Sequence, residues 1–260
     1  MKPLTKPLIP LVIALALLAA ACGDDDSSGA DSTSTDAPAS TTTAVPLSEF
    51  TTTLATEAPQ FGPADYDGFR AQPTACGADV PEPVELMTFD EPEDMAIDPA
   101  TPITVTISTS CGDIVVELDP SIAPETVNSF VFLADQGYFD GGASHRIAPG
   151  FLMQAGDPTA TGRGGPGYAI PDELPAGDAA YTRGTLAMAN AGPDTGGSQF
   201  FIMLDDVGLP PAYSVFGQVV EGLDVLDTIA AVPLGFNASG EPSSPLESVY
   251  LVKVTVDLPG

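Results

Sequence analysis

The sequence predicts a mainly β fold, a closed antiparallel barrel of about eight strands with two helices capping it. The first observation is that apolar and polar residues alternate in the manner of strands in ITVTIST (103–109) and DIVVELD (113–119). The second is a series of later short apolar runs separated by turns rich in Gly, Pro and Asp. The third is that only two segments carry helical periodicity. Many short strands with few helices are typical of a barrel.

The first two strands are joined by Ser110-Cys111-Gly112, a turn that predicts an antiparallel pair. Further strands are expected at 151–154, 185–189, 200–204, 215–220 and 249–256. The first helix is expected to begin at Pro124 and to end near Gly137, because Pro is favoured in the first turn and Gly after the last. Its apolar residues recur at helical spacing: Val127, Phe130, Val131 and Ala134. A second helix is expected at 223–230.

The N-terminus has the layout of a secretory signal: Lys2 and Lys6, an apolar run at 8–21, then Cys22. The run is too short to span a membrane. LAAAC (18–22) resembles the lipobox of bacterial lipoproteins, although Leu18 lies four places before the cysteine and not the usual three. We expect residues 1–21 to be a lipoprotein signal peptide and Cys22 to be lipidated, anchoring an exported protein to the outer face of the cell membrane. The alternative is an ordinary cleaved signal with an incidental cysteine.

Composition divides the rest of the chain into three parts. Residues 22–46 are acidic and rich in Ser and Thr, with almost no large apolar side chains, so they predict a disordered tether. Aromatic residues return among many prolines at 47–102, which predicts an irregular extension packed on the barrel. The barrel itself is expected at 103–258.

Cys76 and Cys111 remain as a pair once Cys22 is set aside. An oxidising compartment favours a disulfide between them. Two buried thiols or a redox pair are the alternatives, and no CxxC spacing supports the redox pair.

Charge and histidine content exclude several classes of function. Lys+Arg number 7 against Asp+Glu 36, a net charge of -29, so nucleic acid is not expected as a partner. The acidity is explained by solubility of an exported surface, by a cationic partner or by adaptation to salt. The single histidine, His145, cannot supply a catalytic triad and an imidazole-rich metal site, and we expect no metal or cofactor. GRGGPG (162–167) matches GxGxxG, but Pro166 and Pro171 prevent the helix that should receive a pyrophosphate.

Two segments, HRIAPGFLMQAGD (145–157) and LAMANAGPDTGGSQFFI (186–202), are unusual for a plain core. They resemble, in order and nearly residue for residue, the two active-site signatures of the cyclophilins. The resemblance extends from the first strand through VFGQVVEGLDVLDTI (215–229) to the last strand. It implies a cyclophilin-like barrel, peptidyl-prolyl cis-trans isomerase activity and proline-containing polypeptides as substrates. We expect a monomer.

The resemblance also implies roles for individual residues. Arg146, Gln154 and Asn190 match catalytic positions. The proline pocket and groove positions are matched by Phe151, Leu152, Ala189, Gln199, Phe201, Leu209 and Tyr213. A side pocket for the residue before proline is matched by Gly162, Arg163, Gly164, Ala191 and Thr195.

Three residues depart from the family pattern. Leu152 replaces the usual Met, Tyr213 stands where His is frequent, and Gly208 is the nearest counterpart of a rim Trp. Leu for Met is a volume-conserving swap that should preserve the pocket. Loss of the Trp removes an aromatic contact and an N–H donor that the family uses to hold cyclosporin.

The chemistry of proline isomerisation suits these residue types. Rotation about a peptide C–N bond faces a barrier of about 18–20 kcal/mol, because resonance gives the bond partial double-bond character. A protonated guanidinium such as that of Arg146 offers several directed N–H donors to a twisting amide, and no nucleophile or cofactor is required. Each apolar residue could instead be ordinary core, and Arg146 a buried structural ion pair. A proline-binding module without turnover, such as an adhesin or scaffold, is the rival function.

Overall fold

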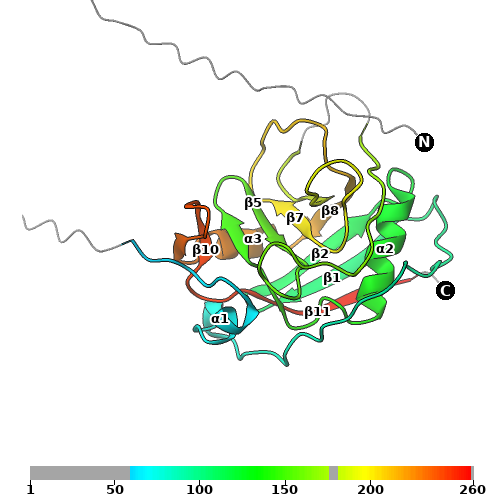
Figure 1. Ribbon diagram of the computed structural model, residues 1–260. Coiled ribbons are helices and arrows are strands. Elements are labelled where there is room, and N and C mark those ends of the chain that lie inside the picture. Colours follow the sequence, from blue (N-terminus) through cyan, green and yellow to red (C-terminus); the bar gives the residue numbers. More distant parts are fainter. Residues whose placement is uncertain (1–58, 176–180, 259–260) are drawn as a thin grey trace, which may run out of the picture. The chain divides into compact units, whose positions relative to one another are not determined.

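The computed structural model describes residues 59–175 and 181–258 (Figure 1). The expected signal peptide, Cys22 and the tether lie outside the described residues. Within these residues, no helix is both long and apolar enough to cross a membrane.

The barrel region is one curled antiparallel sheet of nine strands, in the order β3-β11-β1-β2-β8-β6-β7-β5-β4 (Figure 1). Its strands are β1 (Ile103–Thr109), β2 (Gly112–Leu118), β3 (Gly142–Ala143), β4 (Arg146–Ala148), β5 (Leu152–Ala155), β6 (Thr185–Met188), β7 (Phe200–Met203), β8 (Val215–Glu221) and β11 (Tyr250–Asp257). The two edge strands, β3 and β4, are consecutive in the sequence, so the sheet curls into a half-barrel. The mainly β, antiparallel fold class predicted from the sequence is confirmed, but the sheet has nine strands and forms a half-barrel, whereas a closed barrel of about eight strands was predicted.

A separate two-stranded hairpin consists of β9 (Leu234–Phe236) and β10 (Pro242–Pro245). This hairpin and the short strands β3 and β4 were not predicted, because none of these four segments stands out as an apolar run bounded by turns. The other strands lie where the sequence placed them.

The described residues form three α-helices: α1 (Tyr66–Arg70), α2 (Pro124–Asp135) and α3 (Leu223–Ala230). Pro124 occupies the first turn of α2, as predicted. The α2 helix buries Phe130, whose ring lies 5.0 Å from that of Phe139 and 5.3 Å from that of Phe216. The α3 helix packs against β2 and β4 through Leu226 and Ile229. Both predicted helices therefore cover the main core, and α1 is an addition in the extension.

The extension is irregular apart from α1 and a 3₁₀ turn at Ala75–Gly77, and it packs on the barrel through specific contacts. Phe69 is fully buried, and its carbonyl accepts hydrogen bonds from the Tyr250 hydroxyl and the Ser248 hydroxyl. The Tyr66 hydroxyl donates to the Gly141 carbonyl at 2.7 Å. Contacts between residues so distant in sequence fix the extension as part of the same folded unit.

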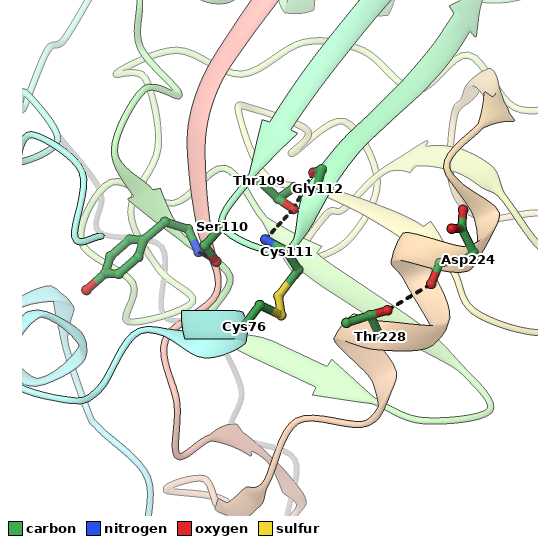
Figure 2. Close-up of a disulfide and its surroundings, with 8 residues drawn as sticks. Cys76, Thr109, Ser110, Cys111, Gly112, Asp224 and Thr228 are labelled. Atoms are coloured by element: carbon green, nitrogen blue, oxygen red, sulfur yellow. Dashed lines mark hydrogen bonds between the residues drawn. A yellow bond between two sulfur atoms is a disulfide. The ribbon is translucent and has the colours of Figure 1, made fainter. Parts of the chain in front are cut away.

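The structure contains the disulfide predicted between Cys76 and Cys111, with the two Cα atoms 5.2 Å apart. It joins the 3₁₀ turn of the extension to the turn between β1 and β2 (Figure 2). Figure 2 also shows the Thr109 hydroxyl, which donates to the Gly112 carbonyl and accepts from the Cys111 N–H. The turn that receives the disulfide is therefore itself ordered by hydrogen bonds.

Candidate active site

Strand register places the predicted site residues on one face of the sheet. Arg146 on β4 lies opposite Gln154 on β5, which lies opposite Phe201 on β7, which lies opposite Ala187 on β6. Directly opposed residues of antiparallel strands project to the same face, and their neighbours along each strand project to the other. The neighbours belong to the main core: Ile147, Met153, Ile202 and Leu186. The outer face of these four strands is therefore free to form a groove.

A second apolar cluster, distinct from the main core, lies on this outer face. It brings together six residues that the sequence assigned to the proline pocket and groove: Phe151, Leu152, Ala189, Phe201, Leu209 and Tyr213. Leu152 and Phe201 are buried, whereas the other four are only partly buried and form its accessible wall. A partly exposed apolar surface that is backed by a sheet is suited to packing against a small ring.

The sequence did not single out five further members of this cluster: Tyr181, Ala187, Met203, Val207 and Val215. Ala187 and Met203 could have been found from strand alternation, because they project to the same face of the sheet as Phe201. Ala187 lies opposite Phe201, and Met203 lies two residues after it on the same strand. Tyr181 carries no such signal. Its buried hydroxyl donates to the Tyr213 carbonyl at 3.2 Å and accepts from the Tyr213 N–H at 3.3 Å, and burial raises its pKa. Tyr181 thereby fixes the backbone that carries Tyr213.

Arg146 lies at the border of the apolar cluster. Its guanidinium is 5.5 Å above the centre of the Phe151 ring. Nε donates to Glu241 Oε2 at 2.8 Å and Nη2 donates to Glu241 Oε1 at 2.7 Å. The pKa of Glu241 is lowered, chiefly by the hydrogen bonds from Arg146. The side chain of Arg146 remains 26% exposed, so it forms an ion pair without being buried by it.

The remaining polar residues of the site are linked by amide hydrogen bonds. Gln154 Nε2 donates to Gln199 Oε1 at 2.9 Å, and Gln199 Nε2 donates to the Gly164 carbonyl at 2.9 Å. Asn190 Nδ2 donates to the Ala212 carbonyl at 2.9 Å. These bonds hold three amide side chains in fixed positions beside the cluster.

The residues predicted for the side pocket line one cavity of about 550 Å³. Its lining includes all five residues predicted for it, Gly162, Arg163, Gly164, Ala191 and Thr195, together with Gln154, Ala189, Asn190 and Gln199. The structure therefore places the side pocket next to the polar residues of the groove.

The buried carboxylate of Asp157 shapes the loop at the rim of this pocket. It accepts hydrogen bonds from the N–H groups of Thr159, Arg163 and Gly164. Burial alone would raise the pKa of Asp157, but hydrogen bonds from Thr159 and Gly164 outweigh it, and the pKa is lowered. A Cβ at Gly164 would collide with Asp157 Oδ1, so this position requires glycine. The GxGxxG match is thus a pocket loop with no helix after it, as expected.

The comparison with protein families decides what this arrangement belongs to. Residues 104–256 match the model of the family described as cyclophilin type peptidyl-prolyl cis-trans isomerase/CLD. The chain belongs to this family.

Cyclophilin-type relatives and structures are similar over the same region. A Mycobacterium tuberculosis protein named probable peptidyl-prolyl cis-trans isomerase B is 42% identical over 175 residues, which cover 62% of this chain and 56% of that protein. The chain thus spans little more than half the length of this relative. A Dictyostelium discoideum protein named peptidyl-prolyl cis-trans isomerase-like 3 is 40% identical over 59% of this chain and 95% of its own length. A crystal structure of a Cryptosporidium parvum cyclophilin type isomerase superposes with a TM-score of 0.56 and 31% identity, over 62% of this chain and all of that one.

Two of the three positions that depart from the cyclophilin pattern, Gly208 and Tyr213, change the wall of the groove. Gly208, the counterpart of the rim Trp, is exposed, and a Cβ placed there would meet no atom within 4 Å. Tyr213 packs edge-on against Phe201, with ring centres 5.3 Å apart. The groove therefore has an open rim at Gly208 and an additional aromatic wall at Tyr213.

His145 precedes Arg146 and is not a member of the apolar cluster. Its Nδ1 is buried without a hydrogen-bond partner among the described residues, and burial lowers its pKa to about 4. At neutral pH the ring is therefore uncharged. In the described part of the chain, no group of three or more His, Cys, Asp or Glu side chains is placed to hold a metal ion.

Proposed function

We propose that this chain catalyses cis-trans isomerisation of Xaa-Pro bonds in exported or cell-envelope polypeptides. The observation that carries the proposal is the position of Arg146, whose side chain is 26% exposed and lies at the border of a partly exposed apolar cluster. Membership of the isomerase family supports it.

The mechanism follows from the two kinds of surface in the groove. The apolar cluster holds the proline ring by burial, while the side pocket takes the preceding residue. As the peptide bond twists, amide resonance is lost and the proline nitrogen becomes pyramidal. Its lone pair is then localised on the nitrogen and can accept a hydrogen bond. Arg146 donates N–H hydrogen bonds to that nitrogen or to the adjacent carbonyl. Donation is stronger to the twisted amide than to the planar one, so the barrier falls.

Retention of Arg146 argues against a pure proline-binding module. Apolar contacts and backbone hydrogen bonds suffice for binding, whereas an exposed guanidinium at the pocket border contributes most when the amide twists. The uncatalysed reaction takes tens of seconds at room temperature, so catalysis is readily detected as loss of the slow phase.

The experiment is an isomerisation assay on a set of Xaa-Pro peptides with the wild type, Arg146→Ala and Arg146→Lys. We expect Arg146→Ala to fold normally and to lower kcat/KM by about 10²–10³-fold, the effect of one preorganised donor. Arg146→Lys should recover little, because an ammonium lacks the planar fork. No activity of the wild type on any peptide would favour the binding module, and full activity of a folded Arg146→Ala variant would refute the role of the arginine.

We further propose that Cys22 is the lipidated first residue of the mature protein and holds the catalytic domain at the outer face of the cell membrane. The apolar run ending in LAAAC and the polar composition after it support this. Mass spectrometry of the N-terminal peptide should find a lipid on Cys22, and Cys22→Ser should release the protein from the membrane fraction. An unmodified N-terminus generated at another position would contradict the anchor.

A further inference from the structure

We infer that Glu241 is a positioning residue for Arg146: its carboxylate fixes the plane of the guanidinium so that the unused N–H donors face the groove. This inference rests on the proposed isomerase function. Glu241 lies in the loop between β9 and β10, 95 residues after Arg146.

The first support is the geometry of the ion pair. Arginine has five N–H donors, and the Nε–H and one N–H of Nη2 are used by Glu241. Two parallel bonds prevent the guanidinium from rotating, whereas a single bond would act as a pivot. Three donors remain, two of them on Nη1, which makes no hydrogen bond to the described residues. Because Phe151 lies beneath the guanidinium, these donors are held at the edge of the apolar pocket.

The second support is that Glu241 is itself held in place. Ser243 Oγ and Asn237 Nδ2 donate to Glu241 Oε2 at 2.9 and 3.2 Å. The backbone N–H of Glu241 donates to Asn237 Oδ1 at 3.0 Å, and the N–H of Asn237 donates to the Glu241 carbonyl at 2.8 Å. A carboxylate that only balanced surface charge would not need this many bonds.

The third support is that the extension braces the hairpin that carries Glu241. The N–H of Phe236 donates to the Gln60 carbonyl at 2.8 Å, and the N–H of Gly62 donates to the Phe236 carbonyl at 3.0 Å. A Cβ at Gly62 would collide with Ser244 of β10, so the two segments are in close contact. Residues 60–62 lie outside the 104–256 family match, and they add support to a residue of the active site.

Glu241 also has an unfavourable effect on catalysis, because its negative charge opposes the electric field of Arg146. The side chains of Arg146 and Glu241 are partly exposed, at 26% and 36%, so water screens the charge of Glu241. Glu241 therefore weakens the electric field of Arg146 only slightly. Fixed orientation matters more, because a small misplacement of a catalytic group can cost about 10²-fold in rate. If orientation dominates, removal of Glu241 lowers the isomerisation rate, and if the opposing charge dominates, it raises the rate. The sign of the change therefore separates the two effects.

The test uses NMR exchange measurements on an Xaa-Pro peptide, which give the interconversion rate of the bound peptide and its Kd separately. We expect Glu241→Ala to lower the bound-state rate by about tenfold while Kd changes by less than about threefold. Glu241→Gln, which has only one acceptor oxygen, should fall between it and the wild type. The matched control is Glu247→Gln, which also removes one negative charge. The side chain of Glu247 makes no hydrogen bond to the described residues.

A double-mutant cycle with Arg146→Lys completes the test. Lysine cannot form the fork, so Glu241→Ala should have almost no further effect on the rate in that background. A Glu241→Ala variant with an unchanged or higher bound-state rate, or with equal losses of rate and affinity, would overturn the positioning role. Absence of exchange in the wild type would instead refute the isomerase function itself.

Discussion

The apolar and polar halves of the groove are held by different means. Phe201 and Leu152 project from neighbouring strands and are packed by the cluster on their own sheet. Arg146 shares that sheet, but its partner Glu241 comes from a separate hairpin, and Gln199 is fixed by the carbonyl of Gly164 on a loop. The apolar half is therefore held by packing of side chains against one another, whereas the polar groups are oriented by hydrogen bonds to a hairpin and a loop.

Phe201→Ala should cause the largest loss of stability, since it removes a buried ring from the apolar half. We expect a decrease of about 3–5 kcal/mol in the free energy of unfolding, measured by chemical denaturation. Val220→Ala, at a residue that is 53% exposed, is the control and should change stability by less than about 0.5 kcal/mol. A loss below about 1 kcal/mol for Phe201→Ala would show that the cluster does not hold the pocket.

The polar half should instead respond to pH through His145. Burial lowers its folded pKa to about 4 from an ordinary value of 6.5. Between these values the unfolded chain binds more protons than the folded one, so stability is full above pH 6.5 and is lost as pH falls towards 4. At about 1.4 kcal/mol per pKa unit, the loss is at most about 3 kcal/mol.

The measurement for His145 is the free energy of unfolding of the wild type and of His145→Phe across this pH range. Carboxylates titrate in both proteins, so the difference between the two curves isolates the histidine. Parallel curves from pH 6.5 to 4 would contradict a buried neutral ring.

The open rim at Gly208 should weaken cyclosporin binding, because the proline pocket persists without the aromatic N–H donor. The missing contact should cost about 1–3 kcal/mol, or roughly 5- to 150-fold in affinity. A Cβ at Gly208 would meet no atom within 4 Å, and Gly208→Trp should restore much of this affinity in an inhibition assay. Nanomolar inhibition of the wild type, or no gain for Gly208→Trp, would contradict this account of the rim.

The apolar half of the groove could be predicted from the sequence more fully than the polar half. Strand alternation placed Phe201 and Leu152 on strands that the structure also contains, whereas Arg146 was found only through its signature segment, because its strand β4 was not predicted. Glu241 was missed because a single acidic residue in a loop, in a chain with 36 of them, carries no periodic signal. Its pairing with Arg146 forms only when the hairpin packs next to β4 in the folded chain.

The extension shows the same limit. Its prolines and aromatic residues predicted irregular packing, and the cysteine pair predicted the link to the first turn of the barrel. The α1 helix was missed because five residues are too short for periodicity, and its cap depends on a single bond from the Gly68 N–H to Asp65 Oδ1. Nor could the pairing of Gln60 and Gly62 with Phe236 be predicted, because it joins residues more than 170 positions apart through backbone atoms alone.

The most direct test of the central claim is to measure Kd and the bound-state interconversion rate for Arg146→Ala and Leu209→Ala with the same Xaa-Pro peptide. The apolar half should govern binding, so Leu209→Ala should raise Kd by about tenfold and leave the bound-state rate nearly unchanged. The arginine should govern turnover, so Arg146→Ala should lower the rate by about 10²–10³-fold with little change in Kd. Equal losses of affinity and rate in both folded variants would contradict the division of the groove into a binding half and a catalytic half.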